Sequence, residues 1–239
     1  QSLILESAQD VSKVINKCND IYLGSINGLA RLNAEDLRKS KKEVSRLEKE
    51  IDKLQNELFY FIQELEEENV KASHFYISLI SILEDMAQSL EYITRASYKH
   101  VNNNHRQLKY SQIKELKETQ SDLEDLLSDI RFSFDINAFE AFATFADKKE
   151  ELFANIDAKI NQQVQRTRSK EEKSPKNTTL FFSLMVETKD LIVATPCLSW
   201  VSFPCSSSFC CFLSFFFFLL LIPCRTQRIY IHQTSLPNL

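Results

Sequence analysis

Proline and glycine are nearly absent from the first 174 residues of this chain, and this limits the fold more than any other feature. The first proline is Pro175, and the only two glycines are Gly24 and Gly28. Turn-rich β folds depend on these residues, whereas long helices joined by short connections need few of them. The sequence therefore predicts an all-α fold.

Apolar residues recur at every third or fourth position up to about residue 195, which is the spacing of one face of a helix. The clearest run predicts a helix over about 34 to 68, with a gap at Ser40. Weaker runs predict three further helices, over about 3 to 30, 111 to 132 and 137 to 168. The last of these rests on Phe142, Ala146, Phe153, Ile156, Ile160 and Val164.

The segment from about 70 to 102 carries two adjoining stripes, so we expect this helix to have neighbours on two sides within a bundle. One stripe runs through Leu79 and Leu83, and the other runs through Ile82 and Asp85. A carboxylate in the second stripe is expected to be partly buried.

A sixth helix is expected to begin at Ser174, a capping residue followed by a proline at the first helical position. Its sequence repeats part of the third helix. The run YISLISILEDM from Tyr76 aligns without a gap with FFSLMVETKDL from Phe181, and the alignment pairs Asp85 with Asp190. The repeat indicates that the third and sixth helices are equivalent parts of two similar units.

The chain resembles the C-terminal cytoplasmic PhoU-like region of Bacteroidetes-type PiT inorganic phosphate transporters. Three runs carry this resemblance in the same order: LNAEDLRKSKKEVSRLEKEI, EDMAQSLEYITRASYKHVNNNH and SPKNTTLFFSLMVETKDLI. The resemblance covers residues 1 to about 195. It implies an antiparallel PhoU-like bundle of six long helices in two tandem three-helix units, residues 1–108 and 109–195, with a truncated last helix.

The resemblance also implies a function. A phosphate-permeating membrane domain is expected to precede Gln1, and this chain is expected to regulate or assemble it without being a permeation pathway. The expected location is the cytoplasmic face of the bacterial inner membrane, and the expected partner is that membrane domain or a second copy of the bundle. The alternatives are a free-standing PhoU-like phosphate-signalling adaptor, a tail-anchored helical interaction protein and a metal-storing bundle.

PhoU proteins carry an acidic E/D-xxx-D pair on the third helix of each unit, where two carboxylates one turn apart serve a metal cluster. Here Ala87 and Glu91 take these positions in one register, and Gln88 and Tyr92 take them in the next. The remaining candidates for a divalent metal are Glu84, Asp85, Glu91, Glu187 and Asp190. The other interpretation is that Asp85 and Asp190 are inward polar groups hydrogen-bonded to neighbouring helices, and no cofactor is required.

Two further segments are candidate contact surfaces. The basic cluster Arg38, Lys39, Lys41 and Lys42 could face anionic lipid or a partner, but acidic residues lie close by, and mixed charge usually indicates a solvated face. The segment YKHVNNNH predicts a helix end and a loop, because asparagine readily adopts the left-handed conformation. Its other interpretation is a polar surface, formed by His100, Asn103 and His105, that faces the transporter.

Enzymatic and nucleic-acid functions are not expected. Two glycines cannot build a phosphate-binding loop, and the sequence contains no GxSxG, HExxH or Walker motif. The net charge is −4 at pH 7, without the basic face typical of nucleic-acid binding. The sequence predicts a non-enzymatic protein that does not bind nucleic acid.

Residues 196–239 differ from the rest of the chain. They are rich in Phe, Cys and Ser, and they contain only two basic residues, Arg225 and Arg228, and no acidic ones. The stretch from Leu198 to Ile222 is long enough to span a bilayer, but Arg225 and Arg228 would then lie on the outer side, against the usual preference. We interpret this irregular apolar tail as a frameshifted or mis-joined segment, with a C-terminal membrane anchor as the alternative.

Overall fold

The computed structural model describes residues 2–63, 70–136 and 145–194. These residues form six helices and contain no strand. The helices are α1 (Ser2–Ala30), α2 (Ala34–Gln63), α3 (Val70–Asn102), α4 (Tyr110–Asp135), α5 (Phe145–Arg168) and α6 (Pro175–Ala194). All six belong to one compact unit. The tail predicted at 196–239 lies outside the described residues.

The predicted all-α class and the number of helices are confirmed. The helix expected over 70 to 102 is found with those bounds, and the sixth helix begins at Pro175. Ser174 caps it, because its Oγ accepts a hydrogen bond from the Asn177 backbone N–H at 3.2 Å. The expected starts of the second and third helices are also correct. The residues expected to extend α2 to 68 and to begin α5 at 137 lie outside the described ranges.

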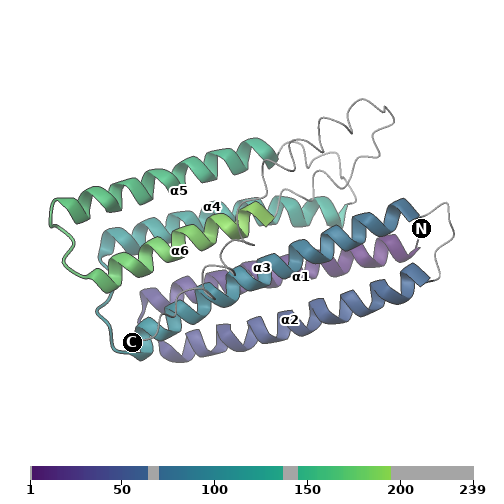
Figure 1. The fold of residues 1–239 in the computed structure, drawn as a ribbon, viewed down its shortest axis with the longest axis horizontal. Helices are drawn as coiled ribbons and strands as arrows, with labels where there is room; N and C mark the ends of the chain where they lie inside the picture. The colour runs from purple at the N-terminus through teal and green to yellow at the C-terminus, as the bar shows by residue number, and fades with distance from the viewer. Residues whose placement is uncertain (1, 64–69, 137–144, 195–239) are drawn as a thin grey trace, which may run out of the picture. The chain divides into compact units, whose positions relative to one another are not determined.

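Successive helices run back and forth in an antiparallel bundle (Figure 1). The α1 helix packs against α2, α3 and α4, and α3 packs against α1, α2 and α6. The α2 and α5 helices lie at opposite edges of the bundle, where each packs mainly on two neighbours. The first and fourth helices of the chain therefore meet each other, as do the third and sixth.

Many buried positions of the two halves of the bundle correspond to each other. Tyr76 and Phe181 are 105 residues apart (181 minus 76), and the same offset relates α1 to α4, α2 to α5 and α3 to α6. Both members of the following pairs are buried: Val11 and Leu116, Cys18 and Leu123, Tyr22 and Leu127, Leu47 and Leu152, Ile51 and Ile156, Leu79 and Leu184, Leu83 and Thr188, Met86 and Leu191. The internal repeat thus extends from one helix of each half to all three.

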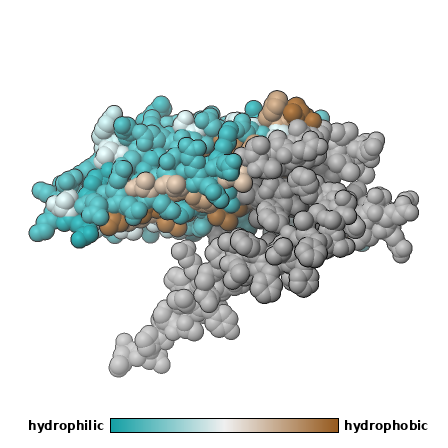
Figure 2. Space-filling view, turned by 90° about the horizontal axis from the view of Figure 1, so that it is seen from above, coloured by the Kyte–Doolittle hydropathy of each residue, from teal (hydrophilic) through white to brown (hydrophobic). Residues whose placement is uncertain are grey.

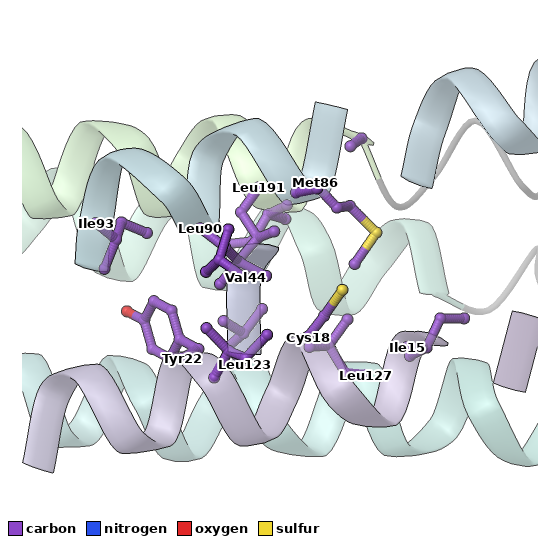
Figure 3. Packing of buried hydrophobic residues seen from close by; sticks show 14 of the residues in the cluster. Ile15, Cys18, Tyr22, Val44, Met86, Leu90, Ile93, Leu123, Leu127 and Leu191 are labelled. Atoms are coloured by element: carbon purple, nitrogen blue, oxygen red, sulfur yellow. The ribbon is translucent and has the colours of Figure 1, made fainter. Parts of the chain in front are cut away.

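The core is continuous through both halves. Figure 3 shows side chains from α1, α2, α3, α4 and α6 meeting in it, including Cys18, Leu123 and Leu191. Burial raises the pKa of the Cys18 thiol to about 12, so this cysteine is an unreactive core residue. The Tyr22 hydroxyl and the Thr188 hydroxyl are hydrogen-bonded at 2.9 Å, which joins the first half to the second.

The two glycines bring α1 close to α2. A Cβ added at Gly24 would lie 2.9 Å from the Ser40 Oγ, and one added at Gly28 would lie 2.9 Å from the Leu37 Cγ. The break in the apolar pattern at Ser40 is therefore filled by a small residue facing a glycine. Gly24 and Gly28 lie four residues apart, one turn of α1, and both positions serve close packing against α2.

Three helices end without glycine in the same way. Leu32, Asn104 and Lys170 have φ values of 53°, 53° and 61°, which is the left-handed region. In each case the next backbone N–H donates to the carbonyl five residues earlier, as in a Schellman motif. The predicted helix end in the asparagine run is confirmed, with Asn104 as the left-handed residue. All three turns lie at the same end of the bundle (Figure 1).

The buried face of α5 differs from the expected one. Ala146 and Val164 were expected to face inward, but both are exposed, and the buried positions are Phe145, Leu152, Ile156 and Gln163. The polar side chain of Gln163 faces the core, and the apolar side chain of Val164 faces solvent. At Val164 the apolar pattern gave the wrong face because the neighbouring α6 offers a polar group there, the Thr178 hydroxyl, to which the Gln163 side-chain amide donates at 3.5 Å.

Candidate functional site

The five acidic candidates for a metal are not brought together as a metal site. Among the described residues, no group of three or more His, Cys, Asp or Glu side chains could hold a metal ion. Glu187 is buried, Glu84, Glu91 and Asp190 are half-buried, and Glu91 forms an ion pair with Arg95 at 3.5 Å.

The expectation that Asp85 is an inward carboxylate is wrong. Asp85 is exposed on α3, where Ser81 lies four residues before it and Gln88 three residues after it. Both are also exposed, so Asp85 belongs to the outward stripe of the helix rather than to either buried one. Its counterpart Asp190 is only half-buried.

The four basic residues at the start of α2 are all exposed. Arg38 pairs with Glu35 at 2.6 Å and Lys39 with Asp36 at 3.8 Å, while the Lys41 ammonium lies 4.7 Å from the centre of the Tyr98 ring. These pairings are those of a solvated face of mixed charge. The interpretation of this cluster as a lipid or partner surface stays a prediction.

Lys39 also lines a groove between α1 and α2, with a volume of about 430 Å³. Gly24 and Ile21 lie in this groove, and its other lining side chains include both acids and bases, among them Asp36 and Arg46. The charged residues that line it are three bases and four acids: Lys17, Lys39, Arg46, Asp20, Asp36, Glu43 and Glu50. It therefore offers no preference for an anion or a cation.

The segment around His100 brings two histidines together. His100 is buried at the end of α3, and its Nε2 lies 2.9 Å from the Arg106 carbonyl oxygen. The chain reverses at Asn104, and the centres of the His100 and His105 rings are then 5.1 Å apart. Asn103 is exposed beside them. The sequence spacing of five did not predict this contact, because the contact depends on the reversal and not on a helical face.

The most unusual group of polar side chains lies between α4 and α5, and the sequence did not predict it. We name it the polar seam and define it as Glu115, Glu118 and Thr119 on α4 with Lys159, Gln163 and Arg166 on α5. Thr119 and Gln163 are fully buried, and Glu115 is nearly so. The signal that could have found it is the offset of 105 residues, because the first half has Val14, Leu54 and Leu58 where the seam has Thr119, Lys159 and Gln163.

One end of the polar seam is a two-pronged ion pair. Arg166 Nη1 and Nη2 each donate to one oxygen of the Glu115 carboxylate at 2.7 Å. The Gln163 side-chain oxygen accepts from Arg166 Nε at 3.1 Å and from Nη2 at 2.9 Å. The hydrogen bonds to Glu115 raise the pKa of Arg166 above its ordinary value, although burial opposes them. Such a planar, bidentate arrangement fixes the register of the two helices.

The middle of the polar seam contains an inward lysine. Lys159 Nζ donates to the Thr119 hydroxyl at 3.0 Å and lies 3.8 Å from a Glu118 oxygen, and the Lys159 side chain is only 11% exposed. The Thr119 hydroxyl donates in turn to the Glu115 carbonyl at 2.9 Å. Met185 of α6 contacts the same hydroxyl, with its sulfur 3.9 Å from the Thr119 oxygen.

Carboxylates crowd the neighbouring part of α4. Burial raises the pKa of the Asp122 carboxyl above its ordinary value, and Lys159 opposes this shift. Asp125, Glu118 and Glu151 raise the pKa further because they are also negative. The cations of α5 therefore face a mostly acidic stretch of α4, and the arrangement holds two helices together by charge.

The comparisons with known proteins add no identification. No family model matches this chain, and neither the curated proteins nor the solved structures gave a match. Within residues 2–63, 70–136 and 145–194, no helix combines the length and apolar character needed to cross a lipid bilayer.

Proposed function

We propose that this chain is the cytoplasmic PhoU-like regulatory or assembly region of an inorganic phosphate transporter, and that it is not itself the permeation pathway. The intact protein would place it on the inner face of the bacterial inner membrane. The partner would be the transporter's membrane domain, and a second copy of the bundle is a further expected partner.

The main support is the correspondence between the two halves of the bundle. A tandem pair of three-helix units is what the resemblance to PhoU-like regions implies, and the burial of α1, α2 and α3 repeats in α4, α5 and α6 at a constant offset. The three runs that carry the resemblance fall on α2, on α3 and on α6. The metal-storing alternative gains no support, because the described acidic candidates form no metal group.

The proposed mechanism is a change in packing. Long helices move as rigid elements, so the bundle can press on a membrane domain or on a second copy of itself. Two arrangements that differ by a few kcal/mol are enough to bias a channel or carrier between open and closed states. The surface that makes this contact would include the exposed basic start of α2 or the turn at Asn103.

The test is a deletion of residues 1–194 from the intact transporter, with phosphate uptake measured in cells at low and high external phosphate. We expect uptake to persist but to lose its dependence on external phosphate. The control is a variant in which the exposed Ser81 is replaced by alanine, which should leave both properties unchanged. Complete loss of uptake by a well-expressed deletion would contradict the proposal, because the region would then belong to the permeation machinery.

A further inference from the structure

The polar seam sets α5 apart from its counterpart α2. At four places the first half has an apolar side chain and the second half does not: Val14 and Thr119, Val44 and Lys149, Leu54 and Lys159, Leu58 and Gln163. The opposite exchange occurs once among the buried positions of α2 and α5, where Ser40 corresponds to Phe145. In the first half, Val14 and Val44 are buried, and Leu54 and Leu58 pack against the core. The second half has a polar or charged side chain at each of these places.

Ion pairs attach α5 to its neighbours, where the corresponding contacts of α2 are mostly apolar. Arg166 with Glu115, Lys159 with Glu118 and Lys148 with Asp129 join α5 to α4, and Asp157 with Lys189 joins α5 to α6. Between α1 and α2, the described residues include one such pair, Lys17 with Glu50 at 2.5 Å. The described part of α5 has three buried apolar side chains, Phe145, Leu152 and Ile156, where α2 has four. Further apolar side chains of each helix pack against the core while partly exposed.

The position of α5 agrees with this weaker attachment. It lies at the edge of the bundle and packs on α4 and α6 less extensively than α2 packs on α1 and α3. Figure 2 views the molecule from the α5 side, and the coloured surface there is mainly hydrophilic. The face of α4 and α6 beneath α5 contains Thr119 and Met185, which are both fully buried.

We propose that α5 is a releasable helix, which separates from α4 and α6 while the rest of the bundle stays folded. Three of the four pairs, Lys159 with Glu118, Lys148 with Asp129 and Lys189 with Asp157, have an exposed partner, so each contributes little and is screened by salt. Only the pair of Arg166 and Glu115 has two largely buried partners, and release of the whole helix returns both of them to water. Release uncovers the α4 and α6 face around Thr119 and Met185. That face can then receive an amphipathic helix whose basic side chains match the acidic stretch of α4 formed by Glu115, Glu118 and Asp122.

If the proposed function is correct, release of α5 is the packing change that acts on the transporter. The inference itself does not depend on the transporter, because it concerns the bundle alone. Equal hydrogen exchange in α5 and α2 would contradict the release of α5 without contradicting the proposed role in phosphate transport. Loss of uptake in the deletion experiment would contradict that role without contradicting the release of α5.

The experiment is hydrogen–deuterium exchange followed by mass spectrometry on the full chain. Peptides from α5 are compared with peptides from α2, at about 0.05 M and about 0.5 M sodium chloride. We expect α5 amides to exchange faster than those of α2, and the higher salt to speed α5 alone by about three- to fivefold. Equal protection of α5 and α2 at both salt concentrations would overturn the inference.

The matched variant gives three seam positions the side chains of the first half, by the triple substitution Thr119→Val, Lys159→Leu and Gln163→Leu. We expect exchange of α5 to slow to the rate of α2 and to lose its salt dependence. The control is Lys17→Gln, which removes the exposed α1–α2 pair and should change neither helix. If the variant folds and its α5 exchange is unchanged, the inference is wrong; if the variant does not fold, the salt dependence of the unmodified chain decides.

Discussion

Arg166 and Glu115 are the residues whose pairing matters most to the second half. Their side chains are 19% and 10% exposed, and both oxygens of the carboxylate are engaged by the guanidinium. A bidentate pair with so little solvent is costly to break from one side, because the remaining charge stays buried. Replacing both partners by apolar residues avoids that cost.

We expect Arg166→Met to lower the free energy of unfolding by about 3 kcal/mol, because it leaves the Glu115 carboxylate buried without its cation. The double variant with Glu115→Leu is expected to recover most of this loss. Urea unfolding followed by circular dichroism measures both. The control is Arg168→Met at an exposed position two residues away, with an expected change within about 0.5 kcal/mol. Equal effects of the single and double variants would contradict this account.

His100 gives the bundle a dependence on pH. Burial lowers the pKa of His100 below its ordinary value, the hydrogen bond to Arg106 opposes this, and His105 lowers it further. As pH falls, the unfolded chain therefore takes up a proton on this imidazole before the folded chain does. More protons bound to the unfolded state mean that stability falls as pH is lowered through this window.

We expect the thermal midpoint to decrease between about pH 7.5 and about pH 5.5, and His100→Gln to lose part of this decrease. Glutamine keeps an N–H that can donate to the Arg106 carbonyl but does not titrate. Thermal unfolding of both proteins at the two pH values measures the difference. His105→Gln serves as the comparison at a half-buried position. If the thermal midpoint of the unmodified chain and that of His100→Gln depend on pH in the same way, His100 is not the cause of this dependence.

At the scale of helices, the sequence predicted where each helix lies in the chain better than it predicted which side of the helix is buried. The scarcity of proline and glycine and the recurrence of apolar residues at every third or fourth position located the six described helices. Both signals are local, so they can be recognised without knowledge of the neighbouring helices. The faces of Asp85, Ala146 and Val164 were misplaced, because which side of a helix is buried depends on where its neighbours lie. The polar seam was missed for the same reason: in one helix alone, Lys159 and Gln163 look like solvated side chains.

The helix ends carry strain that a substitution should relieve. Lys170 is exposed and ends α5 in the left-handed conformation, which glycine adopts at no steric cost. We expect Lys170→Gly to raise the free energy of unfolding by about 0.5 to 1 kcal/mol. The control is Lys173→Gly in the same turn, where φ is not positive and no gain is expected. Chemical denaturation compares them, and a destabilising Lys170→Gly would contradict the assignment.

At the scale of the whole bundle, the two halves complete each other. The α1 helix packs on α4 and α3 packs on α6, so the core of each half faces the other. Polar contacts also cross between them, since Ser12 donates to Asp135 at 2.6 Å and Arg131 donates to Asn16 at 2.7 Å. Either half alone would leave a large apolar surface in water.

We therefore expect residues 1–108 and residues 109–194, prepared separately, to lack a fixed tertiary structure and to form one folded complex when mixed. Burial of the α1–α4 and α3–α6 faces drives the association. Amide NMR spectra of each fragment and of the equimolar mixture measure this. Well-dispersed spectra of the isolated fragments would show that each half folds independently, in which case the shared core is not required.

The most direct test of the central claim, that this bundle belongs to a phosphate transporter, is the DNA sequence that surrounds its coding region. We would determine it from well upstream of the Gln1 codon through the codons for Asp190 to Leu239. The account predicts apolar membrane-spanning segments upstream in the same frame, and a second frame after about codon 195 that continues a charged helix. A start codon next to that of Gln1, with one intact frame to Leu239, would contradict it and indicate a small separate helical protein.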